Sequence, residues 1–414
     1  MAKKKSGMTP MMEQYHSIRR SLPEDVLLMY RLGDFYEMFF EDAQEAASIL
    51  NVALTKRNSI PMCGVPHHAA EGYIGKLIKA NKRVAIAEQT SEPKPGKIVE
   101  REVTQIISAG TISDLNLLDA ERPNYLAAIF KHGGKFGLAY VDMTTGDFRL
   151  TEFVSCEPLA DELGRVCASE LLVSDEQKEA FRQFPGVQIY DGYAFLPDQA
   201  EYTLREHFKV QSLDGFGCSE LTAAVGAAGA VLHYLTHQMR RDAGHVRRLQ
   251  RYQTESHVLI DGPSQANLEL IQSRAGAKHT LLVALDKTKT PMGARKLRDW
   301  VLHPLRDLEK LQARQDMIGA FLKEAFVLCK VQDELKAIRD VERVLGRLSQ
   351  GVGNPRDMQA LAVSLDRLPD LRTHLEALGD QQLLKSLTPR LRDYSNLTDI
   401  LSQALVDEPP VATK

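Results

Sequence analysis

The sequence has few cysteines, no long apolar run and almost no net charge. Its five cysteines are scattered and form no C-x-x-C pair, which argues for reduced thiols and against a disulfide framework or zinc site. No stretch approaches the roughly 18 apolar residues of a membrane-spanning helix. The lysine-rich start has no apolar segment behind it, so no secretory signal is expected. The net charge of −3 means that any DNA-binding cations must be concentrated locally.

Two kinds of ligand-binding pattern are also missing. The phosphate loop G-x-x-x-x-G-K-[ST] does not occur, so neither a nucleotide site nor any other cofactor is expected in this chain. His67 and His68 are adjacent, and such a pair alone is weak evidence for a metal site. The neighbouring Gly64-Val65-Pro66 favours a shaped structural loop over a metal site.

What is present is a globular composition, 43% apolar and 26% charged, over 414 residues. That length suggests about three domains. Residues 1–113 alternate expected strands, such as 26–32 and 82–87, with a helix from Glu41, which predicts an α/β domain. The polar stretch 114–123 ends in proline and is a reasonable linker.

A second α/β domain is predicted over residues 124–252. It begins with a meander of strands at 125–130, 136–142 and 148–153, and it closes with an apolar helical stripe from Leu221 to Leu235. The basic residues that follow are interpreted as a solvated face. These are Arg240, Arg241, Arg247, Arg248 and Arg251.

Residues 256–414 show a helical pattern throughout. Thr290-Pro291 and Asn354-Pro355 each join an N-cap residue to a proline at the first helical position. Met292, Leu297, Trp300 and Val301 are expected to form the apolar side of the first of these helices. The predicted fold class is therefore multidomain, with mixed α/β units followed by an all-α domain.

The segment from Tyr30 to Phe39 carries the most specific chemistry. Phe35 and Glu37 are two residues apart beyond a Gly-Asp turn, so in a strand they point the same way. Such a face carries an apolar wedge beside a hydrogen-bond acceptor, which suits opening a base stack and reading the loosened base. The competing interpretation is core, the usual place for aromatics such as Tyr30, Phe39 and Phe40.

An ordered series of motifs surrounds this segment. It contains TPMMEQY at 9–15, LTKR at 54–57, PMCGVPHHA at 61–69, REVTQ at 101–105, TPMG at 290–293 and RVLGRL at 343–348. In this order the series resembles the bacterial MutS family of DNA mismatch-recognition proteins, from about Thr9 to Pro410.

The resemblance implies that Phe35 stacks on a mispaired base from the minor groove and that Glu37 hydrogen-bonds that base. It implies a mismatch-binding domain, a ribonuclease-H-like connector without nuclease activity and a helical core/lever domain. Intact members are homodimeric ATPases of the cytoplasm and nucleoid that work with the partner MutL. They bind ATP and Mg²⁺ in a carboxy-terminal domain. That domain and the DNA clamp are both expected to lie outside this chain. This chain is therefore expected not to be an enzyme.

Several expectations stay open at this level. Lys56 and Arg57, after an apparent strand at 52–54, form either a charged turn or DNA-backbone contacts. Asp142 lies in a pattern like the first strand of ribonuclease-H-like nucleases, so a metal-dependent nuclease is an alternative, and a partner-docking module is another. Ala109 replaces the family's proline and predicts a less rigid domain exit.

The last helices carry one further expectation. Without the returning chain of the clamp, apolar faces near Leu384, Leu391, Leu397 and Leu401 are expected to be exposed.

Overall fold

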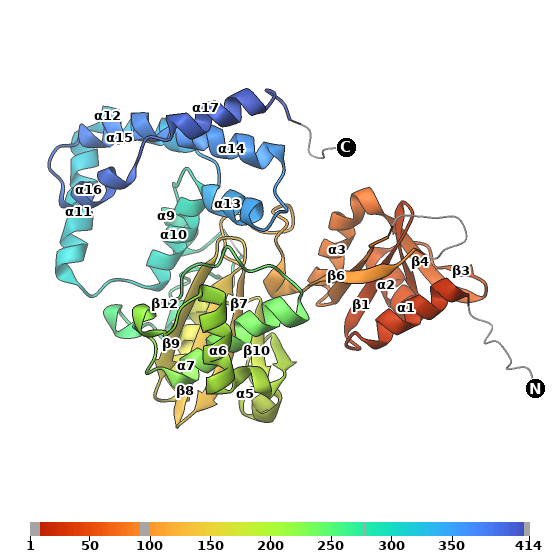
Figure 1. Ribbon diagram of the computed structural model, residues 1–414. Helices are drawn as coiled ribbons and strands as arrows, with labels where there is room; N and C mark the ends of the chain where they lie inside the picture. Colours follow the sequence, from red (N-terminus) through yellow and green to blue (C-terminus); the bar gives the residue numbers. More distant parts are fainter. Residues whose placement is uncertain (1–8, 92–98, 277, 410–414) are drawn as a thin grey trace, which may run out of the picture.

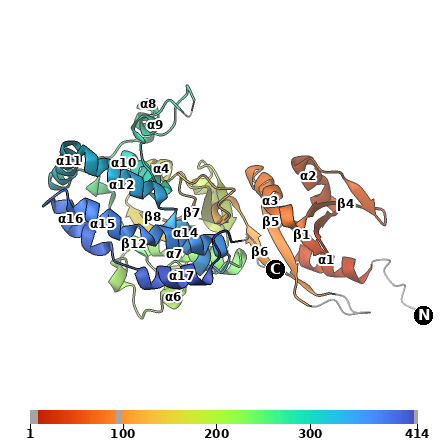
Figure 2. The same cartoon turned by 90° about the horizontal axis from the view of Figure 1, so that it is seen from above.

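The computed structural model describes residues 9–91, 99–276 and 278–409, so the loop expected at 93–96 lies outside the described residues. Three parts follow one another along the chain. Both views place the first part to one side of the other two (Figures 1 and 2). The helical part lies over one end of the middle part's sheet (Figure 1). No helix among the described residues is long and apolar enough to cross a membrane.

The first part is built on a mixed sheet in the order β3-β4-β2-β1-β5-β6. Its central strand β1 (Val26–Leu32) pairs antiparallel with β2 (Phe35–Phe39) and parallel with β5 (Arg83–Gln89). The first five residues of β1 are all buried, since helices cover both faces of the sheet. The other elements are α1 (Pro10–Arg20), α2 (Phe40–Leu50), β3 (Thr55–Arg57), β4 (Ile60–Pro66), α3 (Ala70–Lys79) and β6 (Arg101–Ile107).

The predicted strand at 26–32 and the helix from Glu41 are confirmed, but the strand expected at 52–54 is wrong. The strand β3 begins only at Thr55, so Lys56 and Arg57 lie within it. The turn comes afterwards, at Asn58 and Ser59, where both residues adopt a left-handed φ.

The middle part has a sheet in the order β11-β10-β7-β8-β9-β12. The predicted antiparallel meander is confirmed as β7 (Tyr125–His132), β8 (Lys135–Asp142) and β9 (Asp147–Phe153). Parallel strands β10 (Glu170–Ser174) and β11 (Val187–Tyr190) extend it. The remaining elements are α4 (Cys156–Val166), α5 (Lys178–Phe181), α6 (Pro197–Phe208), α7 (Thr222–His233) and β12 (Gln250–Arg251). The helix α7 is rich in Ala and Gly and packs closely on the sheet, so nearly all of it is buried.

The third part is helical, as predicted. Its helices are α8 (Gly262–Asn267), α9 (Leu281–Leu285), α10 (Pro291–Leu302), α11 (Leu308–Lys323), α12 (Ala325–Ala337), α13 (Val341–Ser349), α14 (Pro355–Asp366), α15 (Leu368–Glu376), α16 (Gln382–Leu387) and α17 (Ser395–Ala404). Both predicted caps are confirmed. Thr290 Oγ1 accepts from the Gly293 N–H at 3.0 Å, and Asn354 forms a capping box with Asp357.

The apolar side predicted for α10 is wrong in part. This helix buries Ala294, Arg295, Arg298 and Leu302, whereas Trp300 is 41% exposed. The guanidinium of Arg314 covers the Trp300 ring at 3.6 Å, a cation–π contact that suits a half-exposed indole. The helix thus buries two arginines and leaves its largest apolar residue half-exposed.

The expected exposure of the last helices holds for Leu397 and fails for Leu384, while Leu391 and Leu401 are partly exposed. Leu384 is only 4% exposed, and Leu391 packs at the edge of a small core around Val331 and Leu371. Leu397 on α17 is 41% exposed. The helices therefore bury part of their apolar surface against one another.

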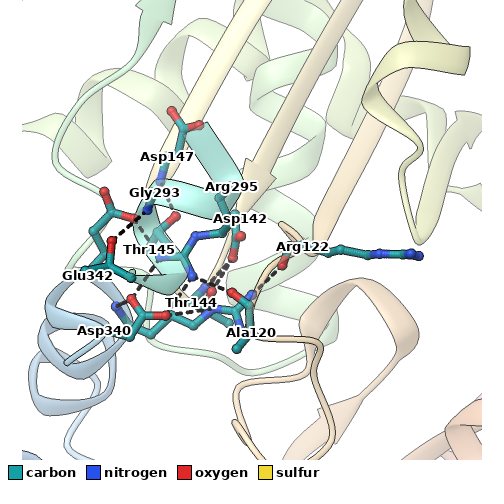
Figure 3. A network of polar contacts seen from close by, with 12 residues as sticks. Ala120, Arg122, Asp142, Thr144, Thr145, Asp147, Gly293, Arg295, Asp340 and Glu342 are labelled. Atoms are coloured by element: carbon teal, nitrogen blue, oxygen red, sulfur yellow. Dashed lines mark hydrogen bonds and ion pairs between the residues drawn. The ribbon is translucent and has the colours of Figure 1, made fainter. Parts of the chain in front are cut away.

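The predicted linker 114–123 is held in place by the helical part. The Arg343 side chain on α13 is 1% exposed and donates to the carbonyls of Asp119 (2.9 Å) and Arg122 (2.5 Å). Arg295 donates to the Ala120 carbonyl at 2.9 Å and also pairs with Asp340 (Figure 3). Three backbone carbonyls of the linker are thereby held by two helices of the helical part.

The same helix also contacts the middle part directly. A Cβ added at Gly346 would lie 2.0 Å from the Thr144 carbonyl oxygen, so only glycine permits this approach. Gln350 donates to the Met143 carbonyl at 3.0 Å. Helix α13 therefore joins the linker, the β8–β9 turn and the helical part.

The basic run after α7 makes specific contacts at its start. Arg240 donates to the Val103 carbonyl of β6 at 2.5 Å, and Arg241 donates to Ser113 at 2.6 Å. Both side chains connect the middle part to the first part. Arg241 is partly buried, which corrects the interpretation for this residue, whereas Arg240 is exposed. Arg247 and Arg248 are exposed, as expected.

The exit of the first domain is also fixed, even though Ala109 replaces proline. Ser108 and Thr111 are buried and form a capping box. The Glu170 carboxylate of β10 accepts from the Ser108 hydroxyl and from the Gly110 N–H at 3.2 Å. Hydrogen bonds thus restrain this segment where the family's proline would do so.

His303 forms a charged contact between the helical and middle parts. Its Nδ1 lies 3.1 Å from Asp299, and its Nε2 lies 3.6 Å from Glu162 on α4. Burial alone would lower the pKa of His303, but these two carboxylates outweigh burial and raise it to about 9. His257 packs edge-on against the same ring at 5.4 Å.

We expect this contact to weaken at alkaline pH. Because the pKa of His303 is higher in the folded than in the unfolded chain, its charge stabilises the fold. This contribution is fully present below pH 6.5, the unfolded-state pKa, and is lost as the pH rises through about 9. Melting temperatures at pH 6.5, 8 and 9.5 should therefore fall more in the native chain than in His303→Gln. An identical pH dependence in the two proteins would contradict this assignment.

Candidate functional site

The β1–β2 turn sets the direction of the candidate wedge. Gly33 adopts a φ of +59°, which glycine accepts without strain, and the Asp34 carbonyl accepts from the His67 N–H at 2.8 Å. Arg31 Nε donates to the Gly33 carbonyl at 2.5 Å. The turn is thus tied to both neighbouring strands, and β2 starts at Phe35 in a fixed register.

Alternation along β2 separates two faces. Phe35 is 48% exposed, whereas Tyr36 and Met38 on the opposite face are buried. The Tyr36 hydroxyl donates to the Glu88 carboxylate, and burial together with that carboxylate raises the pKa of Tyr36 above its usual range. This anchor fixes the strand, so that Phe35 projects away from the core.

The core interpretation is correct for the other aromatics of the segment. Tyr30 and Phe39 are buried and pack edge-on against Tyr15 of α1, with ring centroids 5.4 and 5.0 Å apart. Phe40 is partly buried against the same core. Phe35 alone among these four projects into solvent, which is the arrangement expected of a wedge.

Glu37 lies on the same face as Phe35 and is less exposed. Its Oε2 is 3.0 Å from Arg57 Nη1, across the β3–β4 hairpin. Gly64 is its register partner on β4, and a Cβ there would lie 3.6 Å from Glu37 and 3.9 Å from Phe35. The bare backbone of Gly64 therefore forms the floor between the two side chains.

Lys56 and Arg57, which were predicted to contact the DNA backbone, are successive residues of β3 and therefore point to opposite faces of the sheet. Arg57 is brought to the site by its ion pair with Glu37. Lys56 is exposed, and no hydrogen bond or ion pair of its side chain occurs among the described residues. The sequence missed the Glu37–Arg57 pair because the partners are 20 residues apart and meet only once two hairpins have formed.

His67 and His68 belong to a structural loop. The His67 ring lies 5.5 Å from the Tyr36 ring, and its backbone closes the Asp34 contact. Across residues 9–91, 99–276 and 278–409, no cluster of three potential His, Cys, Asp or Glu ligands could hold a metal ion. The ring and backbone contacts of His67 agree with the structural interpretation.

Asp142 does not form the centre of a nuclease site. It is 1% exposed, and its Oδ1 accepts from the Thr144 N–H at 2.8 Å and the Thr144 hydroxyl at 2.6 Å. Its Oδ2 accepts from the Asn124 N–H at 3.1 Å. Oδ1 thus closes the β8–β9 turn (Figure 3) and Oδ2 holds the start of β7, and this use of both oxygens argues against the nuclease alternative.

Comparison with known proteins gives a consistent result. Three family profiles match in order: MutS domain I over residues 9–116, MutS domain II over 124–247 and MutS domain III over 264–414. The protein named "DNA mismatch repair protein MutS" of Myxococcus xanthus (strain DK1622) is 42% identical over 429 residues, which cover 100% of this chain and 48% of that protein.

A second relative with the same name, from Syntrophobacter fumaroxidans (strain DSM 10017 / MPOB), is 41% identical over 422 residues. That match covers 97% of this chain and 47% of the relative. The chain thus spans about half the length of the curated relatives that it matches. Since three successive domain profiles and both relatives agree across the whole chain, it belongs to the MutS family.

Proposed function

We propose that this chain recognises mispaired or unpaired bases in duplex DNA, with Phe35 as the wedge and Glu37 as the polar contact to the base. The observation that carries the proposal is the half-exposed Phe35 ring beside Glu37, on a strand whose other face is locked into the core. The match to MutS domain I and the names of the relatives support it.

The physical basis is the cost of deforming DNA. An inserted aromatic ring unstacks a base step and kinks the duplex, at a cost of a few kcal/mol. A mismatched step is already loosened, so the same deformation costs less there. Selectivity then depends on the flexibility of the site and needs no particular base sequence.

Arg57 and Lys56 complete the site in this proposal. Arg57 partly neutralises Glu37, so a carboxylate can approach the negatively charged duplex. Both cations lie on β3, which pairs with β4, and β4 in turn pairs with β2, the strand that carries Phe35. In this proposal the two cations contact DNA phosphates. Such contacts position the duplex without reading its sequence.

The other parts follow from the same family relation. We propose a connector at 124–252 and a core/lever domain at 256–414, joined to a mismatch-binding domain at 1–113 through the linker 114–123. Homodimer formation, cooperation with MutL and ATP hydrolysis with Mg²⁺ are proposed for a full-length protein of this family. We assign none of these activities to the 414 residues alone.

We expect Glu37→Gln to weaken discrimination more than total affinity. Removing a charge near phosphates relieves repulsion, so binding to a matched duplex should stay equal or rise. The exposed ion pair with Arg57 is worth only about 0–1 kcal/mol, so the fold should persist. The ratio of mismatched to matched affinity, measured by fluorescence anisotropy, should fall.

Glu41→Gln is the matched control, because Glu41 is an exposed carboxylate on α2 of the same part. Its ratio should equal that of the native chain. A proportional loss of both affinities in Glu37→Gln would show that Glu37 serves the fold and not recognition.

We also expect this chain to bind DNA weakly, with a shallow salt dependence. Each phosphate contact contributes a slope of about −0.9 in a plot of log affinity against log salt. With Lys56 and Arg57 as the candidate contacts, the slope should be about −2. Anisotropy over a salt series measures it, and nanomolar binding at physiological salt would show that further contacts exist.

A further inference from the structure

A cavity of about 520 Å³ lies where the middle part meets the helical part. Its walls come from the β8–β9 turn, the segment 245–250 and helix α10. Three of its lining residues, Asp147, Arg295 and Glu342, lie near one another in Figure 3. The volume is typical of small-molecule sites, and the proposed recognition of DNA does not use it.

The cavity wall has an excess of cations, with seven Arg and Lys side chains against four Asp and Glu. Each of the four carboxylates already has a donor: Asp142 in Thr144, Asp147 in Arg149, Asp299 in Lys296 and Glu342 in Arg295. Within the described residues, three arginines of the wall have no ion pair: Arg247, Arg248 and Arg298. The surplus charge is therefore positive and open to an anion.

Arg298 is the most informative of the three. Its side chain is 9% exposed, and among the described residues its guanidinium makes no hydrogen bond to a carboxylate or carbonyl. The Cys167 thiol acts as a side-chain hydrogen-bond partner of Arg298, and burial lowers the pKa of Arg298. A buried guanidinium without a counter-ion is costly, and an anion bound beside it would offset that cost.

The geometry of the guanidinium narrows the class of ligand. Its planar fork of donors matches the oxygens of phosphate, and several arginines together favour a multiply charged anion. Met292, Leu302 and Tyr125 supply apolar surface on the same wall, which shields such an ion pair from water. We infer that this cavity binds a small phosphate-bearing anion, with Arg298 as the buried anchor and Arg247 and Arg248 at its rim.

Calorimetric titration of the 414-residue chain with inorganic pyrophosphate at low ionic strength tests the inference. Saturable binding to one site is expected. Arg298→Met should weaken the affinity for pyrophosphate at least tenfold. The double variant Arg247→Gln, Arg248→Gln, which changes the rim, should also weaken it at least tenfold. Arg392→Gln, which removes one exposed arginine of the helical part, should leave the affinity unchanged.

Thermal melting separates a ligand site from a structural role. Replacing an unpaired buried charge by an apolar side chain should not lower the melting temperature of the free protein. Pyrophosphate should raise the melting temperature of the native chain but not that of Arg298→Met. If Arg298→Met does not fold, the rim double variant carries the test.

Three results would overturn the inference. The first is the absence of saturable pyrophosphate binding. The second is equal binding by the native chain and both cavity variants, or equal weakening by Arg392→Gln, which would indicate general charge attraction. The third is complete displacement of pyrophosphate by an acidic hexapeptide of equal affinity, which would assign the cavity to a protein segment.

Discussion

Phe35→Ala should abolish the preference for mismatched over matched DNA while leaving the fold intact. Stacking of an aromatic side chain on a base is worth about 1–3 kcal/mol, so the affinity ratio should fall by roughly 5- to 150-fold. The matched duplex, into which the ring enters at greater cost, should lose little affinity. Anisotropy titrations with a single-mismatch duplex and its matched counterpart measure both values.

Phe39→Ala is the control for this experiment, because Phe39 lies on the same strand but is 1% exposed. Truncating a buried phenylalanine costs roughly 3–5 kcal/mol, so this variant should melt at a much lower temperature. Phe35→Ala should melt close to the native chain. A large fall in its melting temperature would instead place Phe35 in the core and remove the wedge assignment.

Arg343→Met should release the interdomain linker. The native guanidinium donates to the carbonyls of Asp119 and Arg122 in part-buried hydrogen bonds, and losing hydrogen bonds to a charged donor costs roughly 1.5–3 kcal/mol. Stability should fall by about this amount, and the linker 114–123 should be cleaved faster by a protease. Thermal melting and limited proteolysis provide the two measurements.

Arg347→Met separates this effect from the general loss of an arginine in α13. Arg347 is on the same helix but contacts Asp357 and the Val352 carbonyl, both within the helical part. In Arg347→Met the linker should be cleaved at the rate of the native chain. Equal cleavage of the linker in the two variants would contradict the role given to Arg343.

Most elements were predictable because their signals are local. The apolar run of β1, the meander β7–β9 and the caps at Thr290 and Asn354 depend on neighbouring residues only. The faces of β2 followed from the two-residue period, and the structure keeps Phe35 and Glu37 on one side. Their roles at a mismatch stay predictions.

Contacts between distant residues were not predictable. The Glu37–Arg57 pair requires two hairpins, and the hydrogen bond from Arg241 to Gln105 requires β6 to dock on the segment that follows α7. Arg343 stood in a recognised motif, yet its task became visible only when α13 and the linker were placed together. Sequence patterns assign charged residues to the exposed face of an element, so they fail for charged residues that are buried by the docking of one part on another.

Base unstacking by Phe35 is the central claim, and 2-aminopurine fluorescence reports it most directly. The probe base is placed beside a single mismatch, and the native chain, Phe35→Ala and Glu41→Gln are compared at concentrations that saturate the duplex. We predict that the native chain and Glu41→Gln raise the emission, because the inserted ring separates the probe from its neighbour, and that Phe35→Ala does not. An equal rise with Phe35→Ala would contradict the account, since the base would then be unstacked without the ring.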